Sequence, residues 1–184
     1  MAAVVQDGNG KYYYMTVGNA DPNASTSQMV TSGSQGGMTL QPLDAKNMDE
    51  AVSLAKQDQN NSQYTDQLQF STTSSMDNSI FSTAQNLQNN INSGDVKYNA
   101  LTNNCGDAVV NVVEKGTGVK LNAGIDPKPN DKFDNIKKNA GQTQDNLDIK
   151  AGKASLITIP STMDNMPPKQ VLIKKIDGQN NGQN

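Results

Sequence analysis

The stretch Tyr98-Asn-Ala-Leu-Thr-Asn-Asn-Cys-Gly-Asp-Ala-Val-Val-Asn-Val-Val-Glu-Lys-Gly116 decides the fold of this chain. It contains the only cysteine, Cys105, at the point where a polar turn runs into an apolar segment. In that segment, valines recur at helical spacing: Val109, Val112 and Val113. This periodicity predicts a helix that begins near Cys105 and ends at Gly116, which is the expected C-cap.

The turn before the helix offers Asn103 or Asn104 as the N-cap, so Cys105 is expected in the first helical turn. There, unpaired backbone N–H groups and the positive end of the helix dipole favour a thiolate. Such a position suits a nucleophile, and its N–H groups can hold an oxyanion. A buried structural thiol is the alternative, since free cysteine is among the most buried residue types. Asp107 is interpreted as a partner of the helix dipole rather than a catalytic acid.

Around this stretch, the patterns predict a small sheet and several helices, hence an α+β fold. Residues 2–5 and 11–17 are expected to form a β-hairpin across the turn at Asp7–Gly10. The clearest helix begins at Ser74 or Ser75 and ends at Gly94. Its apolar residues lie on one face: Met76, Ile80, Ala84, Leu87 and Ile91. Between the hairpin and this helix, we expect a loop over residues 19–37 and a strand over residues 38–43. A helix over residues 49–55 follows and is ended by the polar residues 57–63. A strand is then expected at Leu68 and Phe70.

After the Cys105 helix, the sequence becomes more polar. Asn130-Asp131 is expected to cap a short helix that carries Phe133 and Ile136. Residues 140–153 are polar, strands are expected at 156–159 and 171–176, and residues 177–184 form a polar tail. The predicted organisation is one domain over residues 1–140 and a polar C-terminal extension over residues 141–184.

Composition disfavours several functions for these 184 residues. The net charge is −3 and every basic residue is lysine, so no basic footprint for nucleic acid is present. Roughly a fifth of the residues are Asn or Gln, which adds polarity without charge. Metal ligation lacks its usual His and clustered Cys ligands, and we expect no cofactor. No apolar run approaches the ~20 residues of a membrane span. No signal peptide is recognisable, which leaves the localisation undetermined.

The block from Tyr98 to Val109 resembles the cysteine motif of circularly permuted NlpC/P60 (papain-like) domains. It is similar in particular to the modules at the C-termini of RHS-repeat and other polymorphic toxin proteins. The opening hairpin, the segment Asn47-Met-Asp-Glu-Ala and the segment Pro129-Asn-Asp-Lys-Phe-Asp-Asn-Ile follow in the family's order. The resemblance spans roughly the first three quarters of the chain. It implies a papain-like fold, in which the helix that bears the cysteine packs on a small antiparallel sheet.

The resemblance also implies a function. Cys105 would be the nucleophile of a peptidase or amidase, and its backbone N–H would contribute to the oxyanion hole with support from Asn104. An orienting polar residue would lie on the second strand, at Tyr14 or Thr16. The module would be a toxin or effector within a larger secreted protein, with a peptide or cell-wall peptide as substrate and a cognate immunity protein as a partner.

Catalysis of this type needs a base for the thiol and an acid for the leaving amine. In the family, a histidine on the first strand does this work, and the matching position falls at or just before residues 1–3. The sequence contains no histidine. A non-catalytic binding module on the same scaffold is therefore the alternative hypothesis. An Asn/Gln-rich surface or adhesion protein with long loops around a small core is a third.

Overall fold

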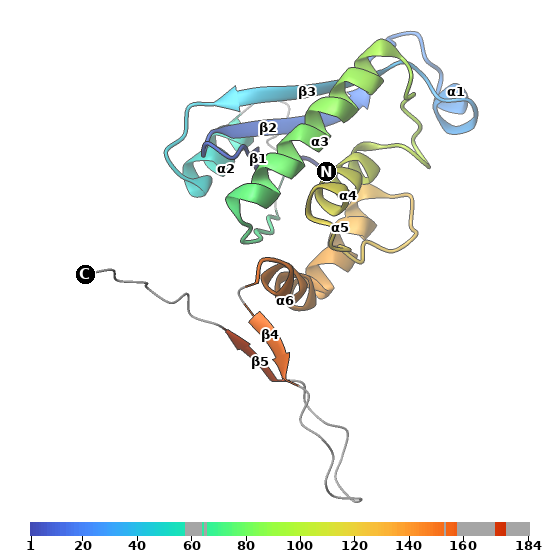
Figure 1. Cartoon of the computed structure of the whole chain (residues 1–184). Coiled ribbons are helices and arrows are strands. Elements are labelled where there is room, and N and C mark those ends of the chain that lie inside the picture. The colour runs from blue at the N-terminus through green and yellow to red at the C-terminus, as the bar shows by residue number, and fades with distance from the viewer. Residues whose placement is uncertain (58–63, 65, 153, 158–171, 176–184) are drawn as a thin grey trace, which may run out of the picture.

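The fold is known from a computed structural model, which describes residues 1–57, 64, 66–152, 154–157 and 172–175. Within these residues, the fold contains six helices and a small three-stranded antiparallel sheet, and a separate pair of strands follows the last helix (Figure 1). The α+β class expected from the sequence is confirmed. Among the described residues, no helix is both long enough and apolar enough to cross a membrane.

The sheet consists of β1 (Ala3–Gln6), β2 (Tyr12–Asn19) and β3 (Gly36–Leu43), in that order. The predicted hairpin is confirmed, with Val5 opposite Tyr13. Its turn is closed by Asp7, whose side chain accepts hydrogen bonds from the N–H groups of Asn9 and Lys11 at 2.9 Å each. The loop expected over residues 19–37 contains a short helix, α1 (Thr26–Thr31), capped by the side chain of Ser25.

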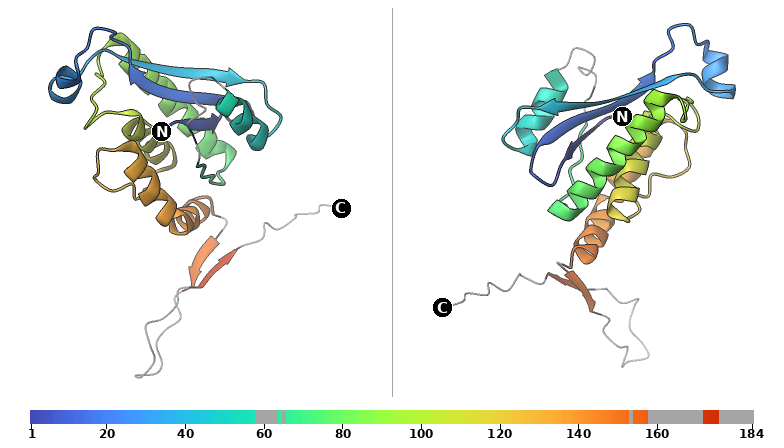
Figure 2. Two further views of the ribbon diagram at one scale, coloured as in Figure 1. Left: turned by 180° about the vertical axis from the view of Figure 1, so that it is seen from behind. Right: turned by 45° about the horizontal axis from the view of Figure 1, so that its top comes forward.

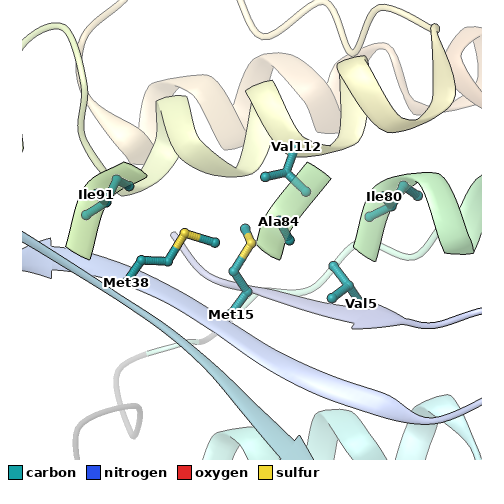
Figure 3. Packing of buried hydrophobic residues seen from close by; sticks show 7 residues of the cluster. All are labelled: Val5, Met15, Met38, Ile80, Ala84, Ile91 and Val112. Carbon is teal, nitrogen blue, oxygen red and sulfur yellow. The ribbon is translucent and has the colours of Figure 1, made fainter. Parts of the chain in front are cut away.

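The main core lies between the sheet and α3 (Ser74–Ser93), as Figure 3 shows. Its buried members come from the three strands, from α3 and from α4: Val5, Met15, Met38, Ile80, Ala84, Ile91 and Val112. The apolar face predicted for α3 is confirmed, because four of its five residues are buried and Leu87 packs against them. The N-cap is Thr73 rather than Ser74 or Ser75, and Gly94 ends the helix in the left-handed conformation as expected.

Helix α2 (Met48–Gln57) packs against the other face of the sheet (Figure 2). Alternate residues of a strand point to opposite faces. On β2, Tyr13, Met15 and Val17 face the α3 core. Tyr12, Tyr14 and Thr16 therefore face α2, whose Ala51 and Ala55 are buried. The predicted start of the break after α2 falls on Gln57, the last residue of the helix, and residues 58–63 lie outside the described residues.

Helix α4 (Cys105–Thr117) begins at the predicted cysteine and packs along α3, with Val112 fully buried in the core. The expected C-cap at Gly116 is wrong, because the helix continues through Gly116 and ends at Gly118 with φ of 69°. Gly116 instead lies against α3. A Cβ atom there would stand 2.5 Å from the Cα of Ile80, so the glycine allows the two helices to approach.

Two helices follow α4 in the chain: α5 (Pro129–Lys138) packs against α4 from its first turn onward, and α6 (Ala140–Lys150) lies near its C-terminal end. The predicted α5 is present with Ile136 buried, although Lys128 takes the N-cap position without a side-chain hydrogen bond. The polar segment after residue 140 is largely helical, and Leu147 is buried with Met76 and Val119. The suggested domain boundary after residue 140 falls in the first turn of α6, which packs against α5.

The strand predicted at Leu68 and Phe70 is wrong. These residues belong to an irregular segment, and both side chains pack on a cluster that includes Leu121, Ala123 and Ile136. The late strands are present as β4 (Ala154–Ile157) and β5 (Leu172–Lys175), which pair antiparallel. Residues 158–171 and the polar tail over 177–184 lie outside the described residues.

Candidate functional site

The turn that precedes α4 is closed by hydrogen bonds among its own residues. The backbones of Asn99 and Asn103 bond reciprocally, with N–H to C=O distances of 3.2 and 3.0 Å. The Asn99 side chain also accepts from the N–H groups of Leu101 and Thr102. Asn side chains favour such turns because they bond to the backbone a few residues on. These hydrogen bonds fix the backbone of residues 99–103 and hence the position at which α4 begins.

Asn104 is the N-cap of α4 and is almost completely buried. Its side-chain oxygen accepts from the N–H groups of Gly106 at 2.8 Å and Asp107 at 3.2 Å. Its side-chain nitrogen donates to the carbonyls of Ala100 at 3.1 Å and Pro127 at 2.7 Å. Both ends of the amide are thus engaged within the protein. Asn104 positions the start of α4, and its direct support of an oxyanion stays a prediction.

Cys105 is the first residue of α4 and its thiol is partly exposed. Within the described part of the chain, its N–H has no hydrogen-bond acceptor, as expected at the first helical position. The Sγ atom accepts a hydrogen bond from the main-chain nitrogen of residue 1 at 3.2 Å. Figures 1 and 2 show the same proximity, with the chain start beside α4. The thiol therefore faces the beginning of the first strand.

Tyr98 lies on the other side of the turn. Its backbone is fixed by two hydrogen bonds with Ser34, at 2.9 and 3.0 Å. The pKa of Tyr98 is raised above its usual value of 10.0, first by burial and second by repulsion from the negative charge of Cys105. The phenol and the thiol are thus close enough to interact electrostatically. Sequence reasoning used Tyr98 only to delimit the motif and did not assign it to the site.

Asp107 completes the first turn of α4. One carboxylate oxygen accepts from the N–H of Asn104 at 3.1 Å, which completes a capping box with that residue. The other oxygen lies 3.0 Å from the Nζ atom of Lys132 on α5. The expected role of Asp107 at the positive end of the helix is consistent with this geometry. Lys132 was missed, because nothing in the sequence pairs two residues so far apart.

The proposed orienting residues on β2 are not brought to the thiol. Tyr14 and Thr16 point toward α2, whereas α4 packs on the side of the sheet that holds Met15. The prediction for these two residues failed because the register of β2 sends them to the other face.

Two surface hollows lie away from the thiol. One, of about 340 Å³, lies at the end of α4 and is lined by residues that include Asn111, Glu114 and Lys120, and the other, of about 560 Å³, lies near the hairpin turn. In the residues that the structure describes, no cluster of three or more His, Cys, Asp or Glu side chains could hold a metal ion. The chemistry that the described geometry offers is that of a thiol at a helix start.

The chain was also compared with known proteins. No family model, curated protein or solved structure matches it. The resemblance to NlpC/P60 domains therefore stays a prediction, which rests on the motif around Cys105 and on the order of elements.

Proposed function

We propose that this chain is a cysteine hydrolase-type module that cleaves an amide bond with Cys105 as the nucleophile. Its fold would be a permuted papain-like one, in which α4 packs on the sheet. The module would act as a toxin or effector within a larger secreted protein, with a peptide or cell-wall peptide as substrate. A cognate immunity protein would protect the producing cell.

One observation carries the proposal: Cys105 is the first residue of a capped helix, with a partly exposed thiol and an N–H that has no acceptor among the described residues. A carbonyl carbon attacked by Sγ places its developing oxyanion near that N–H. Donors that are already oriented stabilise such charge without reorganisation. The fixed turn at Asn99 and Asn103 and the buried Asn104 supply that preorganisation.

The position of the first strand supports the same reading. The resemblance predicts a catalytic base on or just before this strand, and the nitrogen of residue 1 lies 3.2 Å from Sγ. A side chain carried immediately before residue 1 would begin next to the thiol. An imidazole there would accept the thiol proton and then donate it to the leaving amine.

The proposal is tested by adding a histidine at that position. A Gly-His pair is added directly before residue 1, and the purified protein is incubated with a peptide library and with cell-wall peptides. New amino termini are then detected by mass spectrometry. We expect amide hydrolysis that disappears in the Cys105→Ala variant.

The matched control carries a Gly-Ala pair at the same place, which changes the length of the chain but adds no base. The 184-residue chain without added residues, with and without Cys105→Ala, is assayed in parallel. Hydrolysis that is equal with and without Cys105 would refute the proposal. So would a Gly-His protein that remains folded and cleaves nothing in either substrate set.

A non-catalytic binding module on the same scaffold is the second candidate. The specific observation in its favour is that none of the 184 residues is a histidine. A thiol-reactive probe separates the two candidates. A thiol that reacts faster than a model peptide cysteine favours the hydrolase, and one that reacts much more slowly favours the binding module.

A further inference from the structure

Lys132 is an unusual lysine, because it is 7% exposed. Lysine is almost never fully buried unless its charge is paired. Its Nζ atom lies 3.0 Å from a carboxylate oxygen of Asp107, and the two side chains are 8% and 26% exposed. By contrast, Lys137 on the same helix pairs with Asp66 at 2.8 Å, with both side chains more than half exposed. The buried pair links α5 to the turn that carries Cys105.

The start of α5 contacts the first turn of α4 at more than one point. The carbonyl of Pro127, just before α5, accepts from the Asn104 side chain at 2.7 Å. Gly106 is buried and lies in the same turn as Asn104, which contacts Pro127, and Asp107, which contacts Lys132. A Cβ atom there would stand 3.1 Å from the Cα of Pro129 and 3.2 Å from the Cδ of Lys132. The aliphatic part of Lys132 thus lies directly against the residue that follows Cys105.

Charged and titratable groups from four segments meet at the first turn of α4 and its cysteine. Asp107 lies on α4 itself and Lys132 on α5, while Tyr98 precedes the turn and the nitrogen of residue 1 begins the first strand. A carboxylate within one helical turn of a thiolate opposes its formation unless a cation balances the charge. Lys132 is the cation that balances Asp107.

We propose that Lys132 is a positioning residue for Cys105. It neutralises Asp107 and holds the first turn of α4, so that Cys105 lies beside a balanced ion pair. The proposal deepens the proposed function, because it assigns a residue that prepares the nucleophile. The test measures only the reactivity of the Cys105 thiol. Its result is therefore independent of whether the chain hydrolyses an amide.

The experiment measures the rate of Cys105 alkylation by iodoacetamide in the full chain as a function of pH. In Lys132→Met the Asp107 charge is no longer balanced. We expect alkylation near neutral pH to be about threefold to tenfold slower, because a like charge opposes formation of the thiolate. The midpoint of the pH profile should move upward, and the double variant described next separates lost charge balance from a loosened helix start, because loosening would persist in that variant.

Two controls keep the result interpretable. Lys137→Met removes the exposed lysine of the same helix and should leave the profile unchanged. The double variant Lys132→Met with Asp107→Asn removes both charges, and replacing a whole buried ion pair is often neutral for stability. It should return the midpoint to that of the unchanged chain.

Thermal unfolding shows whether each variant is folded. If folded Lys132→Met keeps the original pH profile, the proposal is overturned. If Lys132→Met does not fold, Asp107→Asn decides: it leaves the Lys132 charge unbalanced, so a midpoint shifted downward supports charge balancing, and an unchanged midpoint overturns it.

Discussion

Replacement of Gly116 by alanine tests how closely α3 and α4 approach. Gly116 lies inside α4, and a Cβ atom at this position would stand 2.5 Å from the Cα of Ile80. The same atom would lie 2.7 Å from the backbone nitrogen and the Cγ1 of Ile80. Two of these three atoms belong to the backbone of α3, so no side-chain rotation removes the overlap. The two helices would have to move apart.

Two opposing contributions set the expected change in the free energy of unfolding for Gly116→Ala. Alanine in a helix interior is more favourable than glycine by about 1 kcal/mol. Overpacking in a close-packed interior costs about 1 to 3 kcal/mol, and the upper end applies because backbone must shift. The expected result for Gly116→Ala is a loss of about 2 kcal/mol in the free energy of unfolding. For a domain of this size, that corresponds to a decrease of about 4 to 8 °C in Tm.

The assay is urea unfolding monitored by circular dichroism, with the m-value checked for constancy. The matched control is Gly141→Ala on α6, where an added Cβ atom meets no heavy atom within 4 Å. This variant should gain about 0.5 kcal/mol from helix propensity, less than an interior position because it lies in the first turn. A Gly116→Ala protein as stable as the unchanged chain would contradict the close approach of α3 and α4.

Three further outcomes are expected. Asn104→Ala should lower the free energy of unfolding by about 2 to 4 kcal/mol in urea, since it removes an N-cap and leaves buried backbone groups unpaired. In Cys105→Ala, the pKa of Tyr98 measured by NMR should fall yet stay above 10.0, because burial is the larger cause of its shift. The raised pKa means that the contribution of Tyr98 to stability is fully present below pH 10.0 and is lost as pH rises through the folded-state pKa. Leu147→Ala should cost about 3 kcal/mol in a single urea transition, because this 1% exposed side chain packs α6 against Met76 of α3 and Val119.

Local signals in the sequence were sufficient for the start of α4. An Asn cap, a polar turn and valines at helical spacing all act within a few residues, and the structure places Cys105 at the expected position. The face of α3 was predictable for the same reason, since helical periodicity depends only on the segment itself. The hairpin followed from its turn chemistry and the flanking apolar residues.

The errors arose where tertiary contacts decide the structure. Glycine is the residue type expected at a C-cap, but Gly116 instead allows α3 to pack closely against α4. No local sequence pattern reveals this contact. Leu68 and Phe70 alternate as a strand would, yet they form no ladder and pack on helices instead. Helix α6 buries two residues, Thr143 and Leu147. Its apolar face is therefore too narrow for the sequence pattern to predict a helix. Lys132 became part of the site only through a partner on another helix.

The two edges of the sheet differ in a way that bears on the candidate site. On β3, the N–H of Met38 donates to Asn92 at 2.9 Å, and its carbonyl accepts from Asn92 and Gln88 at 3.1 Å each. Pro42 lies four positions further along the same edge and has no N–H to offer. Side-chain amides and a proline therefore oppose the addition of a strand at β3. The other edge is β1, only four residues long, and the nitrogen two residues before it contacts the thiol of Cys105. Changes at the start of β1 should thus alter the surroundings of Cys105, whereas changes along the outer edge of β3 should leave them intact.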